Sequence, residues 1–460
     1  MTFPRKMESL HRSAVAVAAL LVSAGLAAPT ETGSADLAPM VSPDRLDDAV
    51  TNERAVVANF AWRAFIALNW PSLLGAPDRG LPDRERALGD SGERVWETFK
   101  SDYELFAVGD DDSRVAPEPW GSYAGRNPCG PNVDNRQKTI ASFAPFADFN
   151  QPSFTAGTPA NPLVARNGAY TRYEIHFNEP EFTKFAASGW SQGKNLPDEV
   201  HPAHFPVGSI AVKAAWRPLT AADSPAVRAR YYLERAQIVD PAKTLADRRL
   251  ICSESDVVLV GLHIAIKTKS RSQWIWSTFE HVDDVPPAGE GASREPDARD
   301  DGVPYSYFNP SRPAHLWPPF GTAGALPVDW SNPPKPDPAP MQVVRRHQID
   351  PAVMAVNRAY WALPGVKGTV WEHYMLVAVQ WPTSTAAPGP DNDGAFFPGK
   401  PNAEPVQEES YKSTAKDEEN LINTTMETYL QDHPSSCMAC HQLVSNARGD
   451  DFVGTLAGLR

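Results

Sequence analysis

Hydrophobic positions near the start of the chain follow a helical period. Between Asn52 and Trp70, apolar side chains recur every four positions, at Val56, Phe60, Ala64 and Leu68. This spacing places them on one stripe of an α-helix, which turns once every ~3.6 residues. The pattern predicts a helix over this range, with an apolar face that packs on the core.

Farther along, the pattern changes to the period of two that is typical of β-strands. Six segments are rich in β-branched and aromatic residues, and most of them alternate in polarity. They are Tyr170–Phe177, Gly208–Trp216, Arg230–Val239, Asp256–Lys267, Gln273–Val282 and Thr369–Trp381. Such segments predict an antiparallel sheet or a sandwich.

Two of these segments predict a hairpin with its turn near Ser270. In that register, His263 lies opposite Ser277. His281 then lies roughly 13 Å farther along the ribbon, at ~3.3 Å per residue. The two histidines are therefore too far apart to share a metal ion across this hairpin.

A second helical pattern occurs near the C-terminus. Within Asp417–Gln431, apolar residues return at helical spacing, and Pro434 ends the pattern. A helix first, strands in the middle and a helix last favour the α+β class: an N-terminal helix, an antiparallel sheet or sandwich body, and a helical C-terminal segment.

The region between Val285 and Pro340 holds 14 prolines, yet it also contains several aromatic rings, among them Tyr307 and Trp317. A simple linker would lack such rings. We therefore expect a long ordered loop, 285–340, that packs over the sheet.

Composition and charge narrow the class of protein. The chain has 460 residues, of which 42% are hydrophobic and 10% aromatic, so it can bury a large core. Its formal net charge of −13 disfavours nucleic-acid binding, which needs a basic face.

The first 27 residues have the pattern of a secretory signal peptide. Arg5, Lys6 and Arg12 form a positive region, and the apolar run Ser13–Ala27 ends in small residues. The run is shorter than the roughly 20 residues of a membrane span, and no other segment is apolar for long enough. We therefore expect an exported, periplasmic protein whose mature chain has no membrane span. Its body is expected over 28–404 and a separate C-terminal segment over 405–460.

That C-terminal segment contains the sequence CMACH, which comprises Cys437, Cys440 and His441. C-x-x-C-H is the attachment motif of c-type haem, and chance would produce it on the order of once in a thousand chains of this composition. The two thiols add to two vinyl groups on one edge of the porphyrin, and the histidine binds the iron. A structural zinc site would want a second ligand pair of similar spacing, and a thioredoxin-type dithiol needs no histidine; both are weaker interpretations.

At these three positions the chain resembles the cytochrome c family. The resemblance implies one covalent haem c, with Cys437 and Cys440 as thioether residues and His441 as the proximal iron ligand. In the common small members a distal methionine follows the motif, whereas here only Gln442–Arg460 follows, without Met or His. Longer phrases, such as QWIWSTFEHVDDVP and FIALNWP, look like those of large, little-characterised bacterial proteins of that family.

A sixth iron ligand must therefore come from upstream or be absent. Met426 is the candidate distal ligand, with a core methionine as the alternative. His433 would need a sharp loop to reach the far face. His263 and His281 could each reach a haem, against the alternative of a hydrogen-bonded sheet histidine.

The remaining polar residues predict no catalytic constellation. His201 and His204 have a spacing that could hold a metal ion, but an intervening proline favours a loop. His373 is interpreted as a core histidine. Cys129 and Cys252 are expected to form a disulfide in an oxidising compartment, with two separate buried thiols as the alternative.

These features favour electron transfer through the haem to or from a periplasmic redox partner. The acidic charge would suit a partner with a basic patch. The alternatives are a peroxidase-like oxidoreductase with an open distal site, which the large body favours, and a haem-based sensor. Whether the protein is an enzyme remains open at this point.

Overall fold

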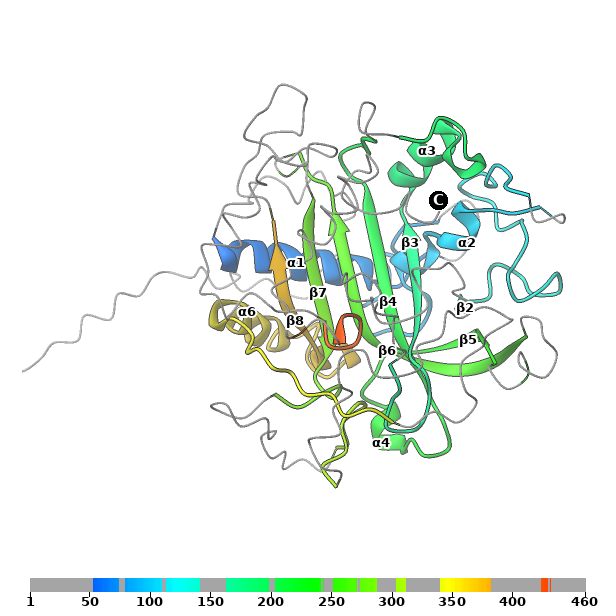
Figure 1. The fold of residues 1–460 in the computed structure, drawn as a ribbon. Helices are drawn as coiled ribbons and strands as arrows, with labels where there is room; N and C mark the ends of the chain where they lie inside the picture. The colour runs from blue at the N-terminus through cyan, green and yellow to red at the C-terminus, as the bar shows by residue number, and fades with distance from the viewer. Residues whose placement is uncertain are drawn as a thin grey trace, which may run out of the picture.

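The computed structural model describes thirteen parts of the chain. They are residues 53–73, 79–109, 113–140, 163–197, 203–240, 243, 251–269, 271, 274–287, 303–311, 340–381, 423–428 and 431. They form a mixed α/β structure around one curled, mainly antiparallel sheet (Figure 1). This arrangement confirms the α+β expectation at the level of the body.

The sheet has eight strands. They are β1 (Lys100–Ser101), β2 (Thr139–Ile140), β3 (Arg172–Phe177), β4 (Ile210–Pro218), β5 (Leu233–Val239), β6 (Cys252–Ile266), β7 (Ile275–His281) and β8 (Tyr374–Gln380). Their order is β1-β3-β4-β6-β5-β2, with β7 on β6 and β8 on β7. The β2–β5 pair is parallel, and every other pair is antiparallel.

The long strand β6 organises this sheet. One edge of it pairs with β4 along most of its length, while the other edge is divided between two strands. β5 pairs with Cys252–Val258, and β7 pairs with Gly261–Ile266. The β4–β6 register shifts at the same level, which is typical of a bulge that bends a sheet. Gly261 therefore lies where the sheet divides.

Two helices cover one face of the sheet, and α1 crosses behind the strands in Figure 1. α1 (Arg54–Leu68) and α6 (Pro351–Trp361) pack on each other and on β8. The Trp62 ring stacks on Tyr360 at 4.9 Å, and its Nε1 donates to Asn357. Asp350 accepts from two backbone N–H groups at the start of α6, and proline at the first position favours this start.

The shorter helical elements lie mainly around the edges of the sheet. They are η4 (Val95–Thr98), α2 (Asp102–Leu105), α3 (Glu179–Ser188), η5 (Trp190–Gln192), α4 (Pro225–Arg228) and η7 (Val370–His373). Phe182 and Phe185 of α3 pack with Ala265 and Trp276 on the face opposite α1. Tyr307 and Met426 lie in a second apolar cluster that includes Tyr173 and Val260.

Several sequence expectations are confirmed and others need correction. Cys129 and Cys252 form the predicted disulfide, with their Cα atoms 5.4 Å apart. Buried Tyr307 fits the expectation of a loop packed on the sheet, although most of 285–340 lies outside the described residues. The hairpin is centred near Ser270, but His263 pairs with Thr278 and not with Ser277. The connection between the strands has an even number of residues, so the register is one position from the predicted one.

The α-helix predicted over Asp417–Gln431 is wrong for its described part. Asn423–Thr428 forms turns, in which the N–H groups of Met426 and Glu427 both donate to the Asn423 carbonyl. The Asn423 side chain also accepts from Thr425, and the Thr428 hydroxyl donates to Thr424 O. Such local side-chain bonds compete with a regular helix.

Candidate functional site

The segment Asn423–Thr428, here called the tail anchor, docks on the sheet face opposite α1. In Figure 1 it lies in front of β6 and β7. All six of its side chains are buried. Asn423 Nδ2 donates to Thr278 Oγ1 at 2.8 Å and to Phe279 O at 3.0 Å. The anchor therefore continues the hydrogen bonding of β7 through a side chain.

A buried carboxylate makes the strongest contacts with the tail anchor. Glu280 on β7 accepts from Thr424 N at 2.6 Å and from Thr424 Oγ1 at 2.7 Å. The Arg345 guanidinium pairs with the same carboxylate from the other side. Beyond the anchor, Gln431 accepts from Arg346 N and donates to Val344 O. Arg346 and Val344 therefore bond the tail directly at Gln431, whereas Arg345 pairs with the carboxylate that binds Thr424.

Close approach of the tail anchor depends on Gly261. A Cβ at this position would overlap Thr425 Oγ1 and crowd Asn423. The adjacent Tyr173 hydroxyl donates to Thr425 O at 2.7 Å. The tail anchor therefore occupies the space that a side chain at residue 261 would otherwise fill.

Charged side chains of the sheet lie next to Glu427, near the end of the tail anchor. Glu427 lies 3.3 Å from His263, which is the cross-strand partner of Lys213. Burial alone would raise the pKa of Glu427, but His263 and Lys213 hold it below its ordinary value. Burial lowers the pKa of Lys213 to about 8, and Glu427 opposes this change. The anchor thus brings an anion to a basic part of the sheet.

The predicted haem residues Cys437, Cys440 and His441 lie outside the described residues, as do His201 and His433. Met426 is fully buried in the cluster of Tyr173 and Val260, so it packs as a core side chain. Its role as a distal ligand stays a prediction.

The two sheet histidines have different environments. His281 is fully buried, accepts from Asp283 N and bonds Arg230 O, as expected for a structural histidine. His263 instead faces the tail anchor. Of the other candidates, His204 is exposed, and His373 is partly buried in η7.

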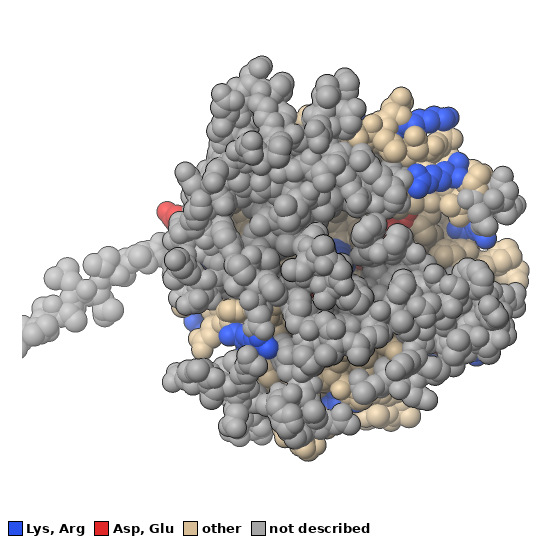
Figure 2. Space-filling view, in the orientation of Figure 1, with Lys and Arg blue, Asp and Glu red and all other residues tan. Residues whose placement is uncertain are grey.

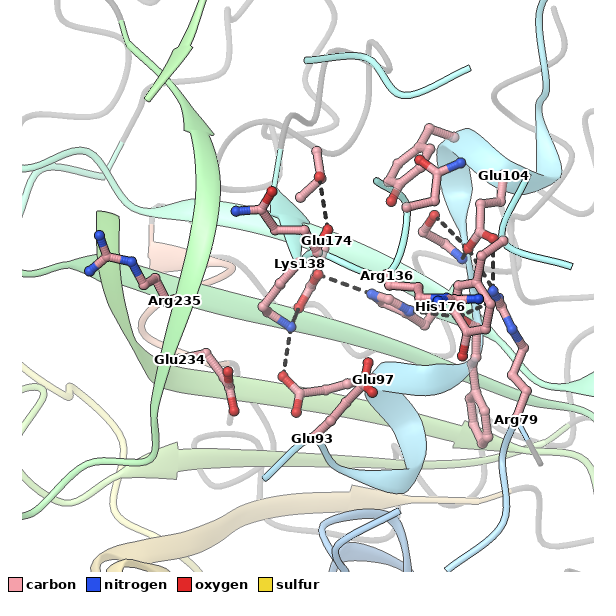
Figure 3. Close-up of a pocket in the computed structure, with 17 residues that line it drawn as sticks. Arg79, Glu93, Glu97, Glu104, Arg136, Lys138, Glu174, His176, Glu234 and Arg235 are labelled. Carbon is pink, nitrogen blue, oxygen red and sulfur yellow. Dashed lines mark hydrogen bonds and ion pairs between the residues drawn. The ribbon is translucent and has the colours of Figure 1, made fainter. Parts of the chain in front are cut away.

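A separate polar cavity of about 230 Å³ lies beside β3 and β5. Figure 3 shows its charged side chains, which come from η4, α2, β3, β5 and the neighbouring loops. Side-chain direction alternates along a strand. Tyr173 on β3 reaches the tail anchor, and the next residue, Glu174, reaches this cavity. The cavity and the anchor therefore lie on opposite faces of the sheet.

Lys138 is at the centre of the cavity wall. Its Nζ lies 2.7 Å from Glu97 Oε1 and 2.8 Å from Glu174 Oε1. It also lies over the rings of Trp96 and Trp216, at 4.9 and 4.4 Å from their centres. Burial opposes its charge, but the two carboxylates raise the pKa of Lys138 above its ordinary value.

Glu174 links this lysine to a histidine. Its Oε2 lies 3.0 Å from His176 Nε2, and Trp216 Nε1 donates to its Oε1. Burial would raise its pKa, but Lys138 and His176 lower it to about 2. Burial likewise opposes the charge of His176, yet Glu174 raises the pKa of that imidazole. Lys138 and Glu174 therefore remain charged at neutral pH.

Two other carboxyls on the cavity behave differently. Burial and the neighbouring Glu97 raise the pKa of Glu93 to about 7. The same two causes raise the pKa of Glu234 to about 7. The Tyr232 hydroxyl lies 2.5 Å from both Glu97 Oε2 and Glu234 Oε1. These two acids therefore gain and lose protons near neutral pH.

At the end of the cavity away from Glu234, the Glu104 carboxylate is paired with two cations. Arg79 makes two hydrogen bonds to Glu104, and Lys100 makes a third. Ser101 donates to the same carboxylate from its N–H and its hydroxyl. Burial would raise the pKa of Glu104, but Arg79 and Lys100 lower it.

Sequence reasoning missed this cavity, because its residues are spread from Arg79 to Arg235. The single local signal is charge inside β-rich segments, such as Glu174 and His176 in the segment Tyr170–Phe177. Charged residues in buried strands are uncommon unless they are paired. That signal identifies the β3 side of the cavity and not the residues from other segments that line the rest of it.

Comparisons with known proteins identify no relative of this chain. No family model matches the chain, and no curated protein or solved structure is significantly similar to it. Among the described residues, no helix is both long and apolar enough to span a bilayer. The same part of the chain contains no group of three or more His, Cys, Asp or Glu arranged to hold a metal ion.

Proposed function

We propose that this protein is an exported c-type haem protein that acts in electron transfer. The observation that carries the proposal is the C-x-x-C-H motif in a chain with a secretory signal pattern. The donor set fits haem c, because two thiols and an adjacent imidazole are the groups that this cofactor requires. A bound haem c supplies an iron that gains and loses one electron.

The roles of the chain's own residues follow from this chemistry. Cys437 and Cys440 hold the porphyrin through thioethers, and His441 is the proximal ligand. The C-terminal segment 405–460 is the haem-bearing part, and the body 28–404 supplies its docking surface. The Cys129–Cys252 disulfide supports export, because such bonds persist in oxidising compartments such as the periplasm.

The tail anchor supports a fixed position for the haem. Gln431 is bonded to the body, and Cys437 follows six residues later. A chain of six residues spans at most roughly 20 Å, at ~3.3–3.6 Å per residue. On this proposal the haem is held within roughly 20 Å of Gln431.

The partner is a periplasmic redox protein, proposed to carry a basic patch because the whole chain is acidic. Figure 2 shows the face that carries the tail anchor. The described Lys and Arg side chains that can be seen in this view lie at separate places. The charge complementarity therefore rests on the overall net charge.

Haem attachment is tested by producing the protein in a host that exports it and matures c-type cytochromes. The purified chain should be coloured and should weigh one haem more than the processed polypeptide. Cys437→Ser/Cys440→Ser should remove both signals. Cys129→Ser/Cys252→Ser is the matched control, because it removes the other two cysteines and should leave one haem per folded chain. A colourless wild-type protein of polypeptide mass would refute the proposal.

The distal side separates electron transfer from the peroxidase-like oxidoreductase and sensor alternatives. A low-spin iron that ignores carbon monoxide supports electron transfer, whereas a high-spin iron that binds it supports the alternatives. Met426→Leu removes the thioether and keeps nearly the same volume. A change from low to high spin in this variant would assign Met426 as the distal ligand. An unchanged spectrum would assign it to the core alone.

A further inference from the structure

The carboxyls on the polar cavity fall into two groups. Glu97, Glu104 and Glu174 each pair with a lysine or an arginine. Glu93 and Glu234 also line the cavity, but neither has an ion pair among the described residues. The cavity thus contains two acidic groups for which the described part of the chain supplies no dedicated cation.

The surroundings of these two acids favour an added positive charge. The titratable groups that act on them are Arg94 and Glu97 near η4, Lys138 before β2, His176 on β3 and Tyr232 before β5. Lys138 and His176 are already held by other carboxylates. Arg94 donates to backbone carbonyls and lies over the Tyr232 ring. In Figure 3, Glu93, Glu97 and Glu234 gather on one side of Lys138.

The cavity has the size and walls for a small molecule. Its volume of about 230 Å³ corresponds to roughly seven water molecules at ~30 Å³ each. Phe99, Tyr103 and Tyr123 line it and provide apolar rings next to the carboxyls. An ammonium group has three N–H donors for carboxylates, and aromatic faces attract it.

We propose that this cavity binds a small organic amine, whose ammonium group is held by Glu93 and Glu234. The ammonium replaces the protons that the two carboxyls carry when they are neutral. An alkyl or ring portion of the ligand then packs against Phe99 and Tyr103. A metal ion fits less well, because the described residues contain no set of three suitable ligands. This proposal is independent of the haem.

The test uses calorimetric titration of the full mature protein with n-propylammonium, a probe whose amine resembles a lysine side chain (pKa about 10.4). Propan-1-ol is the neutral control of similar shape. Only the ammonium should bind, and it should release protons, which titrations in two buffers of different ionisation enthalpy measure. Affinity should be higher at pH 8 than at pH 6 by about tenfold for each carboxyl of pKa near 7 that must lose its proton, and therefore by about 100-fold when both do.

Glu93→Gln and Glu234→Gln should each weaken binding at least about tenfold and reduce the proton release. Glu85→Gln is the matched control, because Glu85 is exposed on the neighbouring loop and does not line the cavity. Circular dichroism verifies that each variant is folded. The proton release is measured on the wild-type protein, so the proposal can still be tested if a variant does not fold. Equal binding of propan-1-ol, absent binding, or binding that neither variant changes would overturn the proposal. Tighter binding of Mg²⁺ or Ca²⁺ than of the amine would assign the site to metal ions instead.

Discussion

Gly261 is the residue at which the tail and the sheet come closest. Gly261→Ala should lower the free energy of unfolding by about 1–3 kcal/mol, because the new methyl group overlaps Thr425 Oγ1. Limited proteolysis should also cut the tail faster, since the anchor is pushed from the sheet. Chemical denaturation and a protease time course measure the two effects.

Thr425→Ala provides the matching test at the other side of this contact. The double variant Gly261→Ala/Thr425→Ala should be destabilised by less than the sum of the two single changes, because the overlapping hydroxyl is gone. Simple additivity would show that the two residues do not meet as described.

His281 illustrates how a single residue changes its chemistry inside the sheet. Burial lowers the pKa of His281 to about 3, so it stays neutral at neutral pH and bonds Asp283 N and Arg230 O. From the sequence, His281 could either reach a haem or be a hydrogen-bonded histidine of the sheet. Its contacts favour the alternative, because both ring nitrogens already have partners.

At the scale of elements, the Glu280 carboxylate of β7 accepts hydrogen bonds from Thr424 of the tail and forms an ion pair with Arg345. Arg345→Met should destabilise the protein by about 3–5 kcal/mol, because it leaves the buried Glu280 carboxylate without its cation. Arg345→Met/Glu280→Gln should recover part of this loss. Urea denaturation measures both variants.

The control for this prediction is an exposed ion pair on β5. Arg235 pairs with Glu254 near the protein surface, so Arg235→Met should change stability by less than about 1 kcal/mol. A similar loss in both arginine variants would mean that burial of the Glu280 pair has no special weight.

The prediction of elements from the sequence succeeded where the period was clear. The stripe from Val56 to Leu68 predicted α1 to within two residues at each end. β6 begins four residues before its predicted start, because its polar first half is a pairing partner for β5 and has no apolar alternation. Residues 370–373 form η7 and not a strand, since Thr369 caps the turn through its side chain. The cap Asp350-Pro351 was a usable signal for the missed helix α6.

At the scale of the whole molecule, the disulfide joins residues 123 positions apart. Cys129→Ser/Cys252→Ser should lower the free energy of unfolding by about 2–5 kcal/mol, because the unfolded chain regains the freedom of a long loop. Thermal and urea unfolding measure the loss. Unchanged stability would show that the bridge adds nothing to the folded state.

Stability should also depend on pH in a direction set by the buried acids. Glu93 and Glu234 have pKa values of about 7 when folded, and burial raises that of Asp102 to about 6. The folded state therefore binds more protons than the unfolded state as pH falls from 8 to 5.5. His281, below its ordinary pKa, and Lys213, whose pKa burial lowers to about 8, act in the opposite direction, but they are two groups against three. We expect the free energy of unfolding to be about 1–3 kcal/mol larger at pH 5.5 than at pH 8, and the urea midpoint to be correspondingly higher.

Glu93→Gln/Glu234→Gln should reduce this difference. At pH 8 the variant should be more stable than the wild type, because it lacks the carboxylates that burial and Glu97 disfavour. At pH 5.5 the two proteins should be nearly equal. A wild-type midpoint that rises steadily from pH 5.5 to pH 8 would contradict the prediction.

The sequence by itself predicted α1, six of the eight strands and the pairing of the two non-motif cysteines, and it contains the C-x-x-C-H motif from which haem attachment is proposed. These features depend on local period, spacing and residue chemistry. Only the tertiary structure decided that Gly261 admits the tail, that Glu280 anchors it, and that Glu93 and Glu234 share a cavity with Lys138. Steric clearance and the pKa of a carboxyl depend on the groups around them, and in this fold those groups come from distant parts of the chain.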